Sequence, residues 1–302
     1  MTAFMKTGGT LGEVFVGFLL LAFIFILIER VLGRRRGQPW LRRGWVVNVI
    51  YWFFSPLVTG TLTKFFLIAP VLVLLWFGVA TGDDFRLGQY RGFGPVARQP
   101  VWLQIIELYL MFDFIGYWTH RLFHRRRWWP FHAVHHSPED LDWLSGVRLH
   151  PINELFSKLC QISPFLLLGF NPLVTLYVVP VFTYHAIFVH AAVDWDFGPL
   201  RGIIVSPVFH RWHHSKDRAA WNKNFSGLFA FWDRIFGTCY MPRDRLPENF
   251  GIPEEFPEGF LGQLGRPFVQ FMANRPEDDS GPGSSEAVSS STDSREPPTS
   301  AS

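Results

Sequence analysis

The sequence predicts an all-α integral membrane protein, in which transmembrane helices and a re-entrant or hairpin pair carry a cytoplasmic helical cap rich in histidine. The first observation is composition: 48% of the 302 residues are hydrophobic and the mean hydropathy is +0.14, which argues against an ordinary soluble domain. The second is that long apolar runs alternate with short clusters of arginine. The third is that all eleven histidines fall between His120 and His214.

The first apolar run, residues 14–28, is uncharged and contains one glycine. Together with residues 8–13 it is about 20 residues long, enough to cross a bilayer core of about 30 Å. A secretory signal peptide is the alternative, but it would carry its positive charge before the run and small residues after it. Here only Lys6 precedes the run and arginines follow it, so we expect a retained transmembrane helix.

Arginine clusters set the expected orientation. Residues 34–43 hold five arginines, and a second basic cluster follows at 121–127. Because short loops rich in arginine stay in the cytoplasm, the N-terminus should lie outside and an even number of crossings should separate the two clusters. The simplest solution is one crossing within 45–82, a region interrupted by proline and glycine, and one crossing at 101–119.

The second half of the chain predicts a hairpin, a cap and a tail. The apolar stretch 162–189 is split by Gly-Phe-Asn-Pro at 169–172, a turn signal, so we expect two helices that return to their starting side. Residues 198–270 are polar enough for an extramembrane cap, and the end of the chain is an acidic Ser/Pro-rich segment for which we expect disorder. The predicted division is 1–100 for the N-terminal membrane helices and loops, 101–270 for the histidine-rich domain, and 271–302 for the tail.

The histidines have a regular spacing. His120 and His124 form H-x-x-x-H, while the H-x-x-H-H pattern occurs twice, starting at His132 and at His210. On a helix, positions i, i+3 and i+4 project from one face, so each cluster can aim two or three imidazoles at one point. Asp113 lies on the same helical stripe as His120 and His124.

This pattern predicts a metal site. Imidazole suits Fe, Zn, Cu and Ni, and the histidines are numerous enough for two octahedral metals that share a bridge, which need on the order of ten ligand positions. A pH sensor is the alternative, but it needs no repeated spacing. The cysteines, Cys160 and Cys239, form no C-x-x-C, and the chain contains no nucleotide-binding loop, nucleophile elbow, H-E-x-x-H or haem-attachment motif. The sequence therefore shows no site for a reductant of its own.

The order of these motifs resembles the fatty acid hydroxylase/sterol desaturase superfamily over about residues 101–240, most closely its bacterial members. The residues that carry the resemblance are Asp113, Tyr117-Trp118, His120-Arg121, His124, Phe131-His132, His135-His136-Ser137, Arg148, His150-Pro151, His190, Pro207, His210, His213-His214, Asn224-Phe225, Trp232-Asp233 and Phe236-Gly237-Thr238. The chain departs from many relatives at Ala191 and Ala192, where an asparagine is common, and at Ser226.

The resemblance implies a fatty acid hydroxylase-like domain with two non-haem iron ions held by histidine alone. The residues that match the ligand motifs, and that would carry catalysis through the metals, are His120, His124, His132, His135, His136, His190, His210, His213 and His214. His185 and His150 are further candidate ligands; His185 lies about 140° from His190 on an ideal helix. Asp113, Arg148, Asn224 and Asp233 are expected to support the ligands, with Asp113 holding the free N–H of an imidazole or making a helix–helix hydrogen bond.

The resemblance also implies an activity and partners. We expect an oxidoreductase that uses O2 and external electrons to hydroxylate or desaturate a C–H bond of a fatty acyl chain, sterol or carotenoid. Electrons would come from a separate donor protein with its reductase, docked on the basic face around Arg121–Arg127, Arg211 and Lys216; lipid headgroups are the other candidate for that face. The expected location is the bacterial inner membrane, with the site on the cytoplasmic side. The alternatives are a non-redox metalloprotein, either a zinc hydrolase or a metal-stapled structural protein, and a metal transporter.

Overall fold

The computed structural model describes residues 11–33, 42–83 and 92–273. Their elements are α1 (Leu11–Val31), α2 (Trp45–Phe54), η2 (Ser55–Thr59), α3 (Gly60–Phe66), α4 (Ile68–Trp76), α5 (Gly94–Ala97), α6 (Val101–Phe123), α7 (Trp129–His136), η4 (Trp143–Val147), α8 (Pro151–Leu168), η5 (Pro172–Val174), α9 (Thr175–His190), η6 (Gly198–Leu200), α10 (Pro207–His213), η7 (Arg218–Ala220), α11 (Phe231–Ile235) and α12 (Phe260–Ala273). Within these ranges there is no β-strand, only two isolated bridges, so the all-α prediction is confirmed for this part of the chain.

Three helical segments are long and apolar enough to cross a membrane, namely Leu11–Val31, Trp45–Trp76 and Pro172–His190. They support the prediction of an integral membrane protein. The second segment is one 32-residue helical rod, which turns from α2 to α3 through a π-helical turn that contains Pro56. A proline lacks the backbone N–H that continues an α-helix, which accounts for the change of helix type there.

The span predicted at 101–119 needs a correction. Those residues do form a helix, α6, but α6 is not among the three membrane candidates of the described chain. Gln104, Glu107 and Asp113 lower its hydropathy, and two of them, Gln104 and Asp113, are buried inside the protein. The helix therefore carries polar groups for internal contacts.

The helical pair predicted over 162–189 is present as α8 and α9. Gly169 ends α8 in the left-handed conformation (φ 76°) and Asn171 caps the following turn by accepting from Leu173 N–H. Pro172 follows at the first position of η5.

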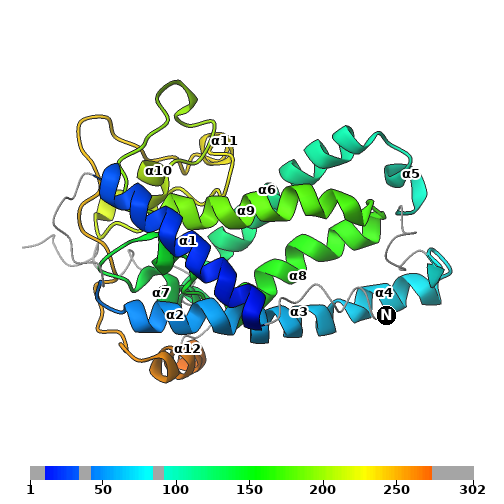
Figure 1. The fold of residues 1–302 in the computed structure, drawn as a ribbon, viewed down its shortest axis with the longest axis horizontal. Coiled ribbons are helices and arrows are strands. Elements are labelled where there is room, and N and C mark those ends of the chain that lie inside the picture. The colour runs from blue at the N-terminus through cyan, green and yellow to red at the C-terminus, as the bar shows by residue number, and fades with distance from the viewer. Residues whose placement is uncertain (1–10, 34–41, 84–91, 274–302) are drawn as a thin grey trace, which may run out of the picture.

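The core of the α6, α8 and α9 bundle is apolar. Leu108 and Phe112 of α6 pack with Phe165 of α8 and Val178 of α9. Figure 1 shows α4, α8 and α9 extending toward one end of the molecule, while α7, α10 and α11 gather with the later loops at the other. The bundle therefore projects one end of each long helix into the region where the histidines lie.

Helix α1 is held against that region by a carboxylate. Glu29 accepts from the backbone N–H groups of Trp143 and Ala192, both at 3.0 Å, and from Arg42 at 2.8 Å. Phe25 stacks on Trp143 with ring centroids 5.6 Å apart. Helix α1 thus contacts both η4, through Trp143, and the segment that follows α9, through Ala192. Of the predicted tail, residues 271–273 belong to α12 and the remainder lies outside the described residues.

Candidate metal centre

Four helix ends bring the histidines together. His120 and His124 stand at the C-terminal end of α6, and His190 is the last residue of α9. Helix α7 carries one H-x-x-H-H motif and α10 the other. Ser206 is the N-cap of α10, and its hydroxyl accepts from Phe209 N–H. This cap fixes the residue at which the helix begins.

Nine of the eleven histidines lie in two compact groups, each of which could hold a metal ion. In each group the facing nitrogens lie within 4.8 Å of one another. The five-histidine group is His120, His124, His132, His136 and His213; the four-histidine group is His135, His190, His210 and His214.

The H-x-x-H-H motifs are shared between the groups. We expected each motif to aim two or three imidazoles at one point, and in each motif two of the three do so. In both motifs the i,i+4 pair stays together, His132 with His136 and His210 with His214, while the intervening histidine joins the other group. The side chains of residues four apart differ in direction by about 40° around the helix axis, and those of residues three apart by about 60° in the opposite sense. One short helix can therefore direct imidazoles toward two adjacent metal sites.

Five imidazoles turn Nδ1 toward an oxygen acceptor, and this contact determines the protonation state of their Nε2 atoms. The Nδ1 contacts are His120 with Phe225 O (2.7 Å), His132 with Asn153 Oδ1 (2.7 Å), His135 with Arg148 O (3.1 Å), His190 with Ala186 O (2.6 Å) and His213 with Lys223 O (2.7 Å). A carbonyl oxygen can only accept, so each Nδ1 donates its proton. Each Nε2 then presents a lone pair to the interior, as a metal ligand must.

These lone pairs face one another. Nε2 of His120 lies 2.9 Å from Nε2 of His132, and Nε2 of His190 lies 3.2 Å from Nε2 of His135. Since all four Nδ1 atoms donate, neither pair is a hydrogen bond between neutral rings. Two nitrogens bound about 2.1 Å from one metal at a right angle are about 3.0 Å apart, so a cation between the rings accounts for both distances.

Further nitrogens lack partners. Among the described residues, no hydrogen-bond partner is found for the buried Nε2 atoms of His124, His136 and His213. In the other group, Nε2 of His210 lies 3.0 Å from Nε2 of His190 and 3.1 Å from Nε2 of His214, so these rings also turn Nε2 inward. Native structures rarely leave buried polar atoms unpaired without a reason such as an ion. The donor set and these unpaired atoms therefore fit two bound metal ions.

Burial keeps the imidazoles neutral. It lowers the pKa of His124, His136 and His213 well below the ordinary value, and neighbouring histidines lower it further. The same causes lower the pKa of His135 and His214. An imidazole must be neutral to bind a metal, so the site is prepared for ligation at neutral pH.

Two buried carboxylates hold the loop beside the five-histidine group. Asp113 accepts the backbone N–H groups of Gly227 (3.2 Å), Leu228 (2.8 Å) and Phe229 (2.7 Å). Asp233 accepts those of Phe225 and Ser226, both at 2.8 Å. Because the carbonyl of Phe225 receives the proton of an imidazole, both carboxylates act on the site through the loop.

The supporting roles expected from sequence need correction in their detail. Asp113 contacts backbone N–H groups and no imidazole, because the loop lies between α6's inner face and the histidines. Arg148 supports His135 through its carbonyl, while its guanidinium binds Asn48 and Ser137. Asn224 adopts φ 59° and pairs with the backbone of Tyr240.

Sequence reasoning missed other direct contacts. Asn153 in α8 faces His132, and the available signal was its place on a polar stripe of α8 with Ser157 and Gln161. The carbonyls of Ala186 and Lys223 have no sequence signal. Gly146 is a third omission, because a Cβ there would lie 2.9 Å from Nδ1 of His190.

Two candidate ligands lie outside both histidine groups, and one residue expected on the docking face is buried. His150 belongs to neither group; it caps α8 by accepting from Ile152 N–H and its Nε2 contacts Leu264 O at 3.1 Å. His185 is also outside both groups, as the helical angle suggested. Arg211, expected on the basic docking face, is only 3% exposed and pairs with Asp194 at 3.1 Å, because α10 turns it toward the interior.

The fold and the site define a helical membrane protein with two adjoining groups of imidazoles that could each hold a metal. Comparison with known proteins then names the family. The fatty acid hydroxylase family model matches residues 105–238, and the chain belongs to the fatty acid hydroxylase/sterol desaturase superfamily.

Three relatives are similar to parts of the chain. Ornithine lipid hydroxylase OlsE of Rhizobium tropici is 35% identical over 63% of this chain and 57% of its own length. Human alkylglycerol monooxygenase is 33% identical over 46% of this chain and 31% of its own length. C-4 methylsterol oxidase erg25 of Schizosaccharomyces pombe is 30% identical over 70% of this chain and 74% of its own length. No solved structure matches the chain.

Proposed function

We propose that this protein is a membrane-bound non-haem di-iron oxygenase, which uses O2 and external electrons to hydroxylate or desaturate a C–H bond of a lipid. The single observation that carries the proposal is the pair of adjoining all-histidine groups, five and four residues in size. The names of the relatives, a lipid hydroxylase, an alkylglycerol monooxygenase and a methylsterol oxidase, support a lipid as substrate and an oxidation as the reaction.

The ligands in this proposal are the nine grouped histidines, with two iron ions bound. When bound, the irons supply O2 activation and the oxidation of the C–H bond. The chain supplies position: each Nδ1 that donates to a carbonyl or amide oxygen holds its ring and leaves Nε2 for the metal. His150 and His185 are not part of this ligand set.

Exclusion of water is the second task of the protein. Phe225 covers one side of the five-histidine group, with its ring 5.0 Å from that of His124 and 5.7 Å from that of His120. Trp129 lies 5.2 Å from the rings of both His124 and His136. An apolar, dry wall strengthens electrostatic interactions and limits side reactions.

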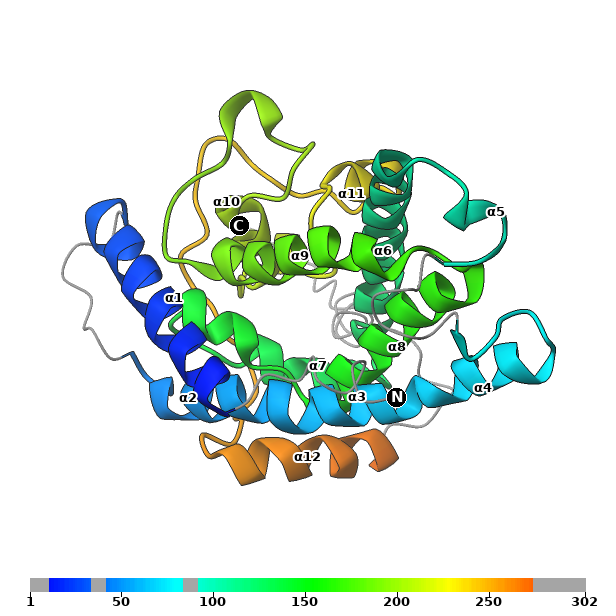
Figure 2. The same ribbon diagram turned by 45° about the vertical axis from the view of Figure 1, so that its right-hand side comes forward.

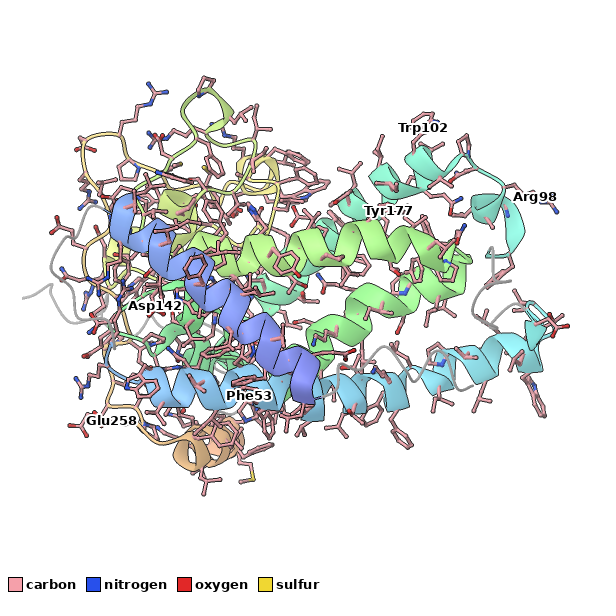
Figure 3. The ribbon with its side chains drawn as sticks, viewed as in Figure 1. Phe53, Arg98, Trp102, Asp142, Tyr177 and Glu258 are labelled. Carbon is pink, nitrogen blue, oxygen red and sulfur yellow. The ribbon has the colours of Figure 1, made fainter. Side chains whose placement is uncertain are left out.

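The substrate reaches the site from the bilayer in this proposal. The helical rod α2–α4 and α9 expose large apolar side chains, among them Phe66, Leu72, Tyr177 and Tyr184, and Figure 3 shows Tyr177 on α9 toward the end away from α7 and α10. A fatty acyl chain, a sterol or a carotenoid suits such a surface. The hairpin α8–α9 would sit in the membrane, with the metal pair on the cytoplasmic side.

Electrons require a separate protein, since the sequence has no reductant motif. Exposed Arg125 and the neighbouring α6–α7 arginines remain the proposed docking surface for an acidic carrier. Arg211 is excluded from it by burial, and Lys216 lies 3.7 Å from Glu139.

Metal content tests the proposal first. We expect near two irons per chain in protein purified in detergent after expression with iron. The double variant His135→Ala/His213→Ala, which removes one ligand from each group, should lose both; His150→Ala/His185→Ala is the matched control and should keep them. Incubation with lipids, reductant and 18O2 should then incorporate the label. One zinc per chain, or turnover without O2, would replace the oxygenase by a hydrolase or a metal-stapled structural protein.

A further inference from the structure

A cavity of about 590 Å³ lies beside the metal centre and is not part of it. Its walls come from the start of α2, the segment after α7, residues 252–258 and α12. Two wall residues connect it to the histidines: Ser137 follows His136, and the carbonyl of Arg148 holds His135. Figure 3 shows Glu258 at this end of the molecule, near the start of α2 and α12.

The walls carry an excess of negative charge. Four carboxylates line the cavity, those of Glu139, Glu254, Glu255 and Glu258, against two guanidinium groups, those of Arg43 and Arg148. Arg43 is engaged by Glu139 and Glu258. The guanidinium of Arg148 is only 5% exposed and its partners are neutral oxygens. Lys216 lies 3.7 Å from Glu139, and Arg266 donates to the backbone carbonyl of Glu255. The carboxylates of Glu254 and Glu255 are exposed and remain the acceptors that this wall offers to a cation.

A buried acceptor on the same wall lacks a donor. Gln263 is 1% exposed, and its Nε2 donates to Pro257 O at 2.8 Å. Its Oε1 has no hydrogen-bond partner among the described residues. An acceptor buried without a donor is costly, so the missing partner is an N–H or O–H group.

The cavity sits beside surfaces suited to hydrocarbon. Residues 261, 265, 268, 269 and 272 of α12 form one exposed stripe, and all are Leu, Gly, Phe, Val or Met. A water-facing helix normally presents polar residues outward, whereas a helix at a lipid interface buries its apolar face among acyl chains. Trp45 and Val46, at the start of α2 and on the cavity wall, are exposed as well. Figure 2 shows α12 running alongside α2 and α3 in that view.

We propose that this cavity binds the protonated amine of a lipid headgroup, with the acyl chains of that lipid against α2 and the outer face of α12. The inference rests on the proposed lipid oxygenase in one respect, that a lipid is the substrate, and it names the class of headgroup. Ammonium N–H groups would donate to Oε1 of Gln263 and to the carboxylates of Glu254 and Glu255.

Lipid binding to the full chain in detergent, read by native mass spectrometry, tests this. The protein is stripped of metal and kept free of O2. We expect phosphatidylethanolamine to bind about tenfold more tightly than phosphatidylcholine, which has a cation without N–H donors, and than anionic phosphatidylglycerol; tenfold is the scale of one hydrogen bond to a charged group.

Variants locate the effect. Glu255→Gln, an exposed change that leaves the fold intact, and Gln263→Leu should each reduce the preference for phosphatidylethanolamine severalfold. Glu248→Gln, the same change in the wall of a different cavity, is the matched control and should preserve it. Equal binding of the three lipids, or an unchanged preference in both cavity variants, would overturn the proposal.

The two proposals fail separately. Because binding is measured without iron, O2 or turnover, a chain that selects the amine but oxidises no lipid would refute only the oxygenase. A chain that holds two irons and incorporates 18O, yet shows no headgroup preference, would refute only the amine site.

Discussion

Asp233 offers the sharpest test of how the fold holds the metal centre. It is fully buried, and its two oxygens accept from Phe225 N–H and Ser226 N–H at 2.8 Å each, and from the Thr238 hydroxyl at 2.6 Å. The carbonyl of the Phe225 residue then receives Nδ1–H of His120 at 2.7 Å. The carboxylate of Asp233 thus fixes the backbone of Phe225, and the carbonyl of Phe225 orients His120.

Asp233→Asn changes this with almost no change in shape. The amide keeps one oxygen and turns an NH2 group toward a backbone N–H, so one bond to a charged group is lost and one buried donor is left unpaired. Together these should cost about 2–4 kcal/mol of stability, or roughly 5–15 °C in Tm for a chain of this size. With Phe225 displaced, we expect iron to fall from near two toward one per chain.

The assay is thermal unfolding and metal analysis on the same detergent-purified samples. Asp244→Asn, at an exposed position of the same cap, is the matched control and should match the wild-type protein in both. A Tm within about 1 °C of wild type, together with full iron content, would refute the claim that Asp233 positions His120.

Three further predictions follow from the geometry. His135→Ala and His136→Ala, neighbours in sequence, should each lower iron content at a different group, so Mössbauer spectra of the two variants should retain different iron signals; identical spectra would contradict the assignment. Gly146→Ala should weaken iron binding because its Cβ would press on the imidazole at the end of α9, whereas Gly17→Ala, with nothing within 4 Å, should not, as metal analysis would show. Burial lowers the pKa of His150 to about 4; the unfolded chain therefore takes up that proton first as the pH falls below about 6.5, and stability declines toward pH 4. His150→Gln should show a smaller loss of Tm between pH 7 and pH 5 than wild type, and an equal loss would contradict this.

Within each helix, the histidine spacing predicted which imidazoles share a face, because that is a local property. His120, His124 and His132 lie on helices whose positions follow from the helical repeat. The division of the motifs between two groups did not follow, since it depends on how α7 and α10 are rotated relative to each other. That rotation is decided by packing, for example of Phe209 against Val189 and Ala230.

The supporting contacts were beyond sequence reasoning for another reason. Asp113 and Leu228 are 115 residues apart, and nothing local in either segment indicates the other. A buried carboxylate in an apolar helix predicted a polar partner, but an imidazole and a backbone N–H satisfy that rule equally well. The expected span at α6 is not among the three membrane candidates of the described chain, because its buried Gln104 and Asp113, together with Glu107, lower its hydropathy.

The shared motifs explain why two metals would act as one centre. His135 and His136 are adjacent in sequence and belong to different groups, and the ring of His136 stacks on that of His214, in the other group, with centroids 4.3 Å apart. Any shift of α7 therefore moves ligands of both groups together. A structural staple needs no such coupling, since one closed four-ligand site suffices to stabilise a fold, whereas a reaction that spreads electrons over two metals needs their separation fixed. This coupling is the strongest physical reason to prefer an oxidoreductase to a metal-stapled membrane protein.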